Sequence, residues 1–231
     1  MIDPQPKKSD LPTRAASAVV MVAVAGAALW LGGWVWTAFA VAVALGVLWE
    51  WWGLVAKLTA SSVGRAIWMI GGLLYVGLAC AALIALRADA LGGALLVLGL
   101  VIAVDIGAYF AGRAIGGRKI APSISPSKTW AGLGGGLLAA AVAWFIFWVL
   151  GASDDIPLSG AIGMAAMIGL VVAVVAQAGD FFESWMKRRA GVKDSGNLIP
   201  GHGGLFDRVD GLIAVLFLGG VIMAIGSVFP S

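Results

Sequence analysis

The chain has 231 residues, of which 61% are hydrophobic and only 12% are charged, and its net charge is +3. Soluble domains average roughly 45–50% apolar and 25% charged residues, so this composition excludes an ordinary soluble protein and indicates a polytopic membrane protein. The apolar stretches have the length of membrane-spanning helices, and we therefore expect an all-α fold. The positive charge suits membrane lipids with anionic headgroups, and we expect no nucleic-acid partner.

The apolar stretches, taken in chain order, predict about seven transmembrane helices after a cytosolic N-terminal segment at 1–14. The predicted helices cover about residues 15–32, 34–55, 66–86, 91–112, 131–150, 160–190 and 211–229. A short re-entrant or interfacial helix would raise their number. The first stretch could instead belong to a signal peptide that is cleaved near Ala23-Val24-Ala25. We expect residues 15–231 to form a single transmembrane domain.

The distribution of Lys and Arg predicts the orientation in the membrane. With these helices, every Lys and Arg except Arg87 falls on the same side as the N-terminus. The positive-inside rule places such a face in the cytosol. We therefore expect a multi-pass protein of a bacterial-type inner membrane, with a cytosolic N-terminus and two cytosolic loops at 113–130 and 179–210.

The densest group of ionisable residues begins where the sixth apolar stretch ends. Asp180, Glu183, Ser184 and Lys187 are spaced three and four residues apart, so a helix that continues past the bilayer presents them on one face. The alternative is an amphipathic extension that lies on the bilayer with its charges in water. A carboxylate at the membrane boundary favours the functional interpretation.

A second pair of carboxylates, Asp207 and Asp210, directly precedes the last apolar stretch. Because they are three residues apart, they point the same way on a first helical turn. Acidic residues also suit any helix N-terminus, which is the structural alternative. Together with Asp180 they could hold Mg²⁺, which takes few carboxylates and completes its shell with water and phosphate.

Two further carboxylates lie inside predicted helices. Asp105 is about two turns from the cytosolic end of the fourth helix, where a carboxylate is costly and usually functional. A structural pair with a cation or a Tyr hydroxyl is as compatible with Asp105 as a catalytic role. Glu50 lies between Trp49 and Trp51 near the end of the second helix, and it could simply reach water.

The loop at 113–130 is basic, rich in hydroxyl groups and interrupted by Gly and Pro. Ser125, Lys128 and Thr129 can offer hydroxyl and ammonium groups to phosphate oxygens, and a helix that starts near Thr129 favours an anion at its N-terminus. His202 is the only His in the chain, which argues against a zinc site. It could act as a general base, bind a phosphate or order its own loop.

The run from Ser184 to Asp210 reads S-x-M-K-R-x4-K-D-x-G-x2-I-P-x-H-G-G-L-x-D-R-V-D. This run resembles the signature of the phosphatidate cytidylyltransferases (CDP-diacylglycerol synthases). Three more segments are similar to that family, namely Asp105–Arg113, Ile124–Thr129 and Gly179–Glu183. The resemblance is clear from about residue 100 to the C-terminus. Ala131 departs from it, because the family usually has Glu there, and no role is carried over to that position.

The resemblance implies transfer of a cytidylyl group from CTP to phosphatidic acid, which gives CDP-diacylglycerol and pyrophosphate in phospholipid biosynthesis. It also implies Mg²⁺, with room for a second metal or a monovalent cation, a homodimer, and a transmembrane catalytic domain with its active site at the cytosolic interface. The implied catalytic residues are Asp180, Asp207 and Lys187, and the implied metal ligands are Asp180, Asp207, Asp210 and Glu183. The implied substrate-binding residues are Ser125, Lys128, Thr129, Ser184, Arg188, Lys193, His202 and Arg208.

Two other functions are compatible with these residues. A CTP-dependent kinase of a polyprenol-type lipid, from families similar to this one, would transfer the γ-phosphoryl group to a hydroxyl and would need a general base. An ion-coupled transporter could use Asp105 and Asp180 in a proton or ion path. The transporter leaves the basic loop and the run from Ser184 to Asp210 unexplained.

Overall fold

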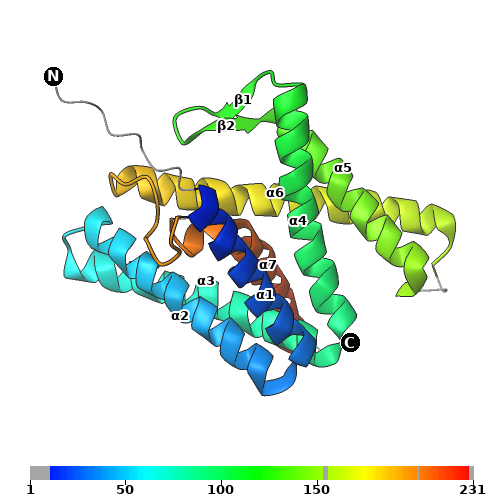
Figure 1. Ribbon diagram of the computed structural model, residues 1–231, viewed down its shortest axis with the longest axis horizontal. Helices are drawn as coiled ribbons and strands as arrows, with labels where there is room; N and C mark the ends of the chain where they lie inside the picture. Colours follow the sequence, from blue (N-terminus) through cyan, green and yellow to red (C-terminus); the bar gives the residue numbers. More distant parts are fainter. Residues whose placement is uncertain (1–10, 153–155, 202, 229–231) are drawn as a thin grey trace.

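The computed structural model describes residues 11–152, 156–201 and 203–228, with side chains from Ala15 onward apart from that of Ala152. A short distorted turn, Trp148–Ala152, follows the fifth of its helices. The helices are α1 (Leu11–Leu31), α2 (Gly33–Leu58), α3 (Ser62–Asp89), α4 (Leu91–Ala114), α5 (Trp130–Phe147), α6 (Leu158–Arg189) and α7 (Phe206–Val228), as Figure 1 shows.

Within the described residues, α2 to α7 are long and apolar enough to cross a membrane, and Ala15–Leu31 in α1 is apolar but shorter. The predicted class, an all-α polytopic membrane protein with about seven helices, is confirmed in this form. Most helices extend a few residues beyond the predicted apolar stretches. The largest difference is at α7, which begins at Phe206 rather than near 211 and therefore includes Asp207 and Asp210.

Side-chain caps and a glycine set several helix boundaries. Ser61 Oγ accepts a hydrogen bond from Gly64 N at 3.3 Å where α3 begins. Thr129 Oγ1 accepts one from Gly132 N at 3.0 Å where α5 begins, and both residues act as N-caps. Gly32, with φ of 65°, separates α1 from α2 in a backbone conformation that favours glycine.

The loop at 113–130 contains a small antiparallel hairpin, which the sequence did not predict. Strand β1 (Lys119–Ala121) pairs with β2 (Ser125–Thr129), and Lys119 lies opposite Thr129. In Figure 1 the hairpin lies at the end of α4 and passes directly into α5. It therefore fixes the hydroxyl-rich end of the loop, including Lys128, beside the helices.

Helix α6 lies between two packed groups of helices and crosses the whole molecule in Figure 1. On one side it packs with α4 and α5 around a core that includes Leu100 and Trp144. On the other side α2, α3 and α7 pack around Trp51 and Phe206, and Met186 of α6 joins that core. The ionisable residues near the end of α6 are thereby placed where the two groups meet.

Candidate active site

Polar residues of α6 and α7 face each other in two layers. The helices are antiparallel, so later residues of α6 lie opposite earlier residues of α7. In the first layer the carboxyl groups of Asp180 and Asp210 lie within hydrogen-bonding reach of each other. In the second layer Lys187 Nζ lies 2.5 Å from Glu183 Oε2 and also pairs with Asp207. Glu183 is only 1% exposed, so the alternative of a surface helix with solvated charges is wrong for this face.

Two glycines allow α6 and α7 to approach closely at the first layer. A Cβ atom at Gly179 would lie 2.6 Å from Ala214 Cβ and 2.7 Å from the backbone oxygen of Asp210. A Cβ atom at Gly211 would lie 3.1 Å from Asp180 Oδ1. The first two distances are far shorter than the 3.5–4.0 Å of favourable carbon contacts. Gly179 precedes Asp180 and Gly211 follows Asp210. The close approach of the two helices at these glycines keeps the two acids side by side.

Lys128 connects the hairpin to the first layer, because its ammonium group pairs with Asp180 Oδ2. Ser127, Lys128 and Thr129 also line a polar cavity of about 470 Å³, together with Asp105, Tyr109, Arg113 and Gln177. The basic loop and the acidic helix, which the sequence could only place on the same side of the membrane, are therefore in direct contact. Ser125 lies at the start of β2 and is half-buried.

Asp207 is held by four donors from three parts of the chain. Its Oδ2 accepts hydrogen bonds from Ser195 N at 2.9 Å and from Gly204 N at 3.0 Å, and it lies 3.0 Å from Ser195 Oγ, whose single proton it shares with Glu50. Its Oδ1 faces Lys187. Asp207 and Asp210 lie on one side of α7, as predicted, but they have different partners. Each carboxylate belongs to its own layer.

The alternative that Glu50 simply reaches water is wrong. It is 3% exposed and accepts hydrogen bonds from Leu205 N at 2.9 Å, Phe206 N at 2.8 Å and Ser195 Oγ at 2.8 Å. It thus supplies, from α2, the acceptors that the first N–H groups of α7 need. The sequence carries a signal for this burial, since Val47 and Leu54 lie three residues before and four after Glu50, and both are buried.

Replacing Glu50 by Ala is expected to destabilise the protein by about 2–4 kcal/mol, because the buried N–H groups at the start of α7 lose their acceptor. Turnover should fall as well, since the start of α7, which Glu50 holds, carries Asp207. The thermal unfolding midpoint in detergent and kcat measure both effects. Leu45→Ala, at a 61% exposed position of the same helix, is the matched control. A midpoint equal to that of the control would show that Glu50 does not hold α7.

Two other predicted substrate-binding residues line a second polar cavity. Lys193 and Arg208 line a space of about 530 Å³ together with Asp194 and Asn197. Arg188 is exposed, and its Nε lies 3.4 Å from the backbone oxygen of Ile124 in the hairpin turn. Ser184 is half-buried on α6. His202 lies outside the described residues.

The donor set fits a hard divalent cation. Among the described residues, the carboxylates of Asp180, Glu183 and Asp207 form ion pairs with two ammonium groups, those of Lys128 and Lys187, and Asp210 lies beside Asp180. The buried Glu183 Oε1 has no hydrogen-bond partner in the described structure. No three acidic, His or Cys side chains in that part of the chain gather into a complete cage, so an ion would take two carboxylates and complete its shell with water or phosphate.

Comparison with known proteins gives the class and then the family. The sequence model of the cytidylyltransferase family matches residues 57–225, and the helices are those of a multi-pass membrane protein. A phosphatidate cytidylyltransferase of Brucella suis is 36% identical, covering 94% of this chain and 95% of the relative. One of Rickettsia bellii is 37% identical over 90% of this chain and 88% of its own. One of Haemophilus influenzae is 51% identical over 119 residues, 51% of this chain and 40% of its own.

The fold and the matched family model define a membrane-embedded nucleotidyltransferase. More closely, the chain belongs to the phosphatidate cytidylyltransferase family, because relatives of that name match it over almost its whole length. Enzymes of this class generally depend on a metal ion, which agrees with the carboxylate layers between α6 and α7.

Proposed function

We propose that this chain transfers the cytidylyl group of CTP to phosphatidic acid, giving CDP-diacylglycerol and pyrophosphate for phospholipid biosynthesis. The observation that carries this proposal is the pair of carboxylate layers between α6 and α7, each with its own lysine. Relatives named for this activity, similar over nearly the full length of both chains, support the same reaction.

The reaction brings two anions together. A phosphate oxygen of phosphatidic acid attacks the α-phosphorus of CTP, the bond from that phosphorus to the bridging oxygen breaks, and pyrophosphate leaves with the electron pair. The phosphate nucleophile is largely ionised at neutral pH, so no side chain has to remove its proton. Lys128 and Lys187, which are already at the carboxylates, would offset phosphate charge in the transition state.

The carboxylates would hold Mg²⁺ and the remaining polar residues would hold phosphates. We assign Asp180 and Asp207 as metal ligands, with Asp210 and Glu183 completing the two layers. Bound there, Mg²⁺ supplies charge neutralisation at the reacting phosphates, and a second metal or a monovalent cation could share the site. The proposed phosphate-binding residues are Ser125, Lys128, Thr129, Ser184, Lys187, Arg188, Lys193, His202 and Arg208.

The placement in the membrane is also part of the proposal. With the helices predicted from the sequence, every Lys and Arg except Arg87 falls on the same side of the membrane as the carboxylates of 179–210, and the positive-inside rule puts that side in the cytosol. CTP would arrive from the cytosol, while the lipid stays in the inner leaflet of a bacterial-type plasma membrane. Residues 15–231 would then form one catalytic domain, with 1–14 in the cytosol. A homodimer is proposed from the family resemblance.

Purified protein with CTP labelled in the α- or γ-phosphate tests the function. With phosphatidic acid, the α-label is expected in a CDP-lipid and the γ-label in pyrophosphate. Chelation of divalent ions should stop the reaction, and Mg²⁺ should restore it. Formation of CDP and a lipid phosphate from a polyprenol would instead identify a kinase. Ion flux in liposomes without nucleotide turnover would identify a transporter, and either result would contradict the proposal.

A further inference from the structure

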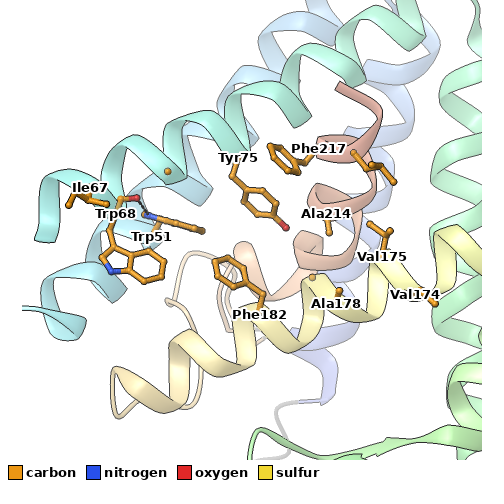
Figure 2. Close-up of a pocket in the computed structure, with 13 residues that line it drawn as sticks. Trp51, Ile67, Trp68, Tyr75, Val174, Val175, Ala178, Phe182, Ala214 and Phe217 are labelled. Carbon is orange, nitrogen blue, oxygen red and sulfur yellow. Dashed lines mark hydrogen bonds between the residues drawn. The ribbon is translucent and has the colours of Figure 1, made fainter. Parts of the chain in front are cut away.

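An apolar groove lies on the side of α6 that faces α3. Helices α3 and α6 both pack on α7 but hardly on each other, and the space between them is a cavity of about 680 Å³ with α7 as its floor. Its described lining contains no charged side chain. Figure 2 shows Trp51, Tyr75, Phe182 and Phe217 around this space, with the Tyr75 hydroxyl pointing into it.

The groove opens to the face of the molecule that the bilayer covers. Ile67 and Val174 belong to its lining, and they are 65% and 46% exposed. At one end the rings of Trp68 and Phe182 join α3 to α6, with 6.5 Å between their centroids. A ligand of this groove can therefore come from the membrane, and it must be apolar, because a charged group gains no partner there and loses its water.

The groove is continuous with the carboxylate layers. Gly179 lines it, precedes Asp180 in α6 and lies against the backbone of Asp210. Ala214, one helical turn after Asp210, lines it as well. Tyr75 is close enough to interact electrostatically with both acids. A chain lying in the groove would thus extend from the first layer of carboxylates.

Helix α6 separates this groove from the polar cavity. Gln177 faces the polar cavity, together with Lys128 and Asp105, whereas Ala178 and Phe182 face the groove. The two substrates of the proposed reaction also differ in polarity, since CTP is a triphosphate and phosphatidic acid carries apolar acyl chains. The structure thus offers a separate approach to the carboxylates for each chemistry.

We propose that the groove between α3 and α6 binds an acyl chain of the lipid substrate and so places its phosphate at Asp180 and Asp210. This inference rests on the proposed function. Bilayer tails are as apolar as the groove, so transfer of a chain from the bilayer gains little hydrophobic free energy. The gain is in orientation, because a held chain keeps the attacking phosphate near the reacting phosphorus.

Filling the groove tests the proposal. A Cβ atom at Gly71, which lines the groove, or at Gly77, which does not, meets no atom within 4 Å, and both residues are exposed on α3. Gly71→Phe is expected to lower kcat/KM for dioleoyl phosphatidic acid at least about tenfold relative to Gly77→Phe, with the KM for CTP within about twofold. Equal values for the two variants would overturn the proposal.

A second pair of variants tests the same proposal if the first pair does not fold. Val174 lines the groove and Val171 does not, although both are on α6 and are 46% and 42% exposed. Val174→Phe is expected to reduce use of the lipid, and Val171→Phe is expected to behave like the wild type. A loss of the same size in both variants would contradict a role for the groove.

A binding measurement separates this inference from the proposed function, because it needs no turnover. Phosphatidic acid with a photoreactive group in its acyl chain is expected to label α3, α6 or α7 within the groove, and dioleoyl phosphatidic acid should suppress the labelling far better than dioleoyl phosphatidylcholine. Equal suppression by both lipids would mean that the groove holds bulk bilayer lipid, and the inference would fail. A wild type that labels but forms no CDP-diacylglycerol would contradict the proposed function alone.

Discussion

Asp180→Asn is expected to lower kcat by at least about a hundredfold, as loss of one electrostatic contact to the transition state does in other enzymes, without unfolding the protein. The amide oxygen can still accept from Lys128, and the amide NH₂ can donate to the Asp210 carboxyl group. The local hydrogen bonds therefore survive while the charge that would hold the cation is removed. Steady-state kinetics together with the thermal unfolding midpoint test both parts.

Two further variants, one control and one second site residue, are compared with Asp180→Asn. Asp89→Asn, an exposed carboxylate at the opposite end of α3, should leave kcat unchanged. Asp207→Asn should cost both activity and stability, because both oxygens of Asp207 face donors and its amide NH₂ would oppose one set of them. Near-normal turnover of Asp180→Asn would remove Asp180 from the site.

Gly179→Ala is expected to reduce kcat about a hundredfold through the geometry of the first layer. The added methyl group would lie 2.6 Å from Ala214 Cβ and 2.7 Å from the backbone oxygen of Asp210, so α6 and α7 must move apart by on the order of 1 Å, a displacement that can cost about this factor. Gly163→Ala in the same helix, where nothing lies within 4 Å, is the control. Equal activity of the two variants would contradict close packing at the first layer.

The sequence predicted the parts of the site that depend on local spacing. Asp180, Glu183 and Lys187 follow helical periodicity, so one face could be assigned without any tertiary contact. The membrane helices followed from length and hydropathy for the same reason. The antiparallel match of α6 to α7, which pairs Asp180 with Asp210, depends on how far α7 extends beyond its apolar stretch. The sequence predicted that Asp207 and Asp210 share a first helical turn, but it did not predict which residues of α6 that turn faces.

Contacts between distant segments could not be predicted in this way. Glu50 is separated from Ser195 by 145 residues, and its flanking Trp residues suggested an interfacial position rather than burial. Strand β2 consists of S-P-S-K-T, which lacks the alternation of apolar residues by which strands are identified. The ion pair of Lys128 with Asp180 spans 52 residues and depends on that hairpin. These contacts depend on tertiary packing, and the spacing of residues in a single sequence does not reveal them.

The central claim is that carboxylates of α6 and α7 share the cation that lets two phosphates meet. Anomalous diffraction from crystals grown with Mn²⁺ in place of Mg²⁺ tests it most directly. We expect a Mn²⁺ peak between α6 and α7, within about 2.0–2.4 Å of a carboxylate oxygen of Asp180 or Asp207, and we expect Asp180→Asn to weaken it. Strong Mn²⁺ peaks found only away from these residues, in crystals of enzyme that turns over CTP with Mn²⁺, would contradict the account.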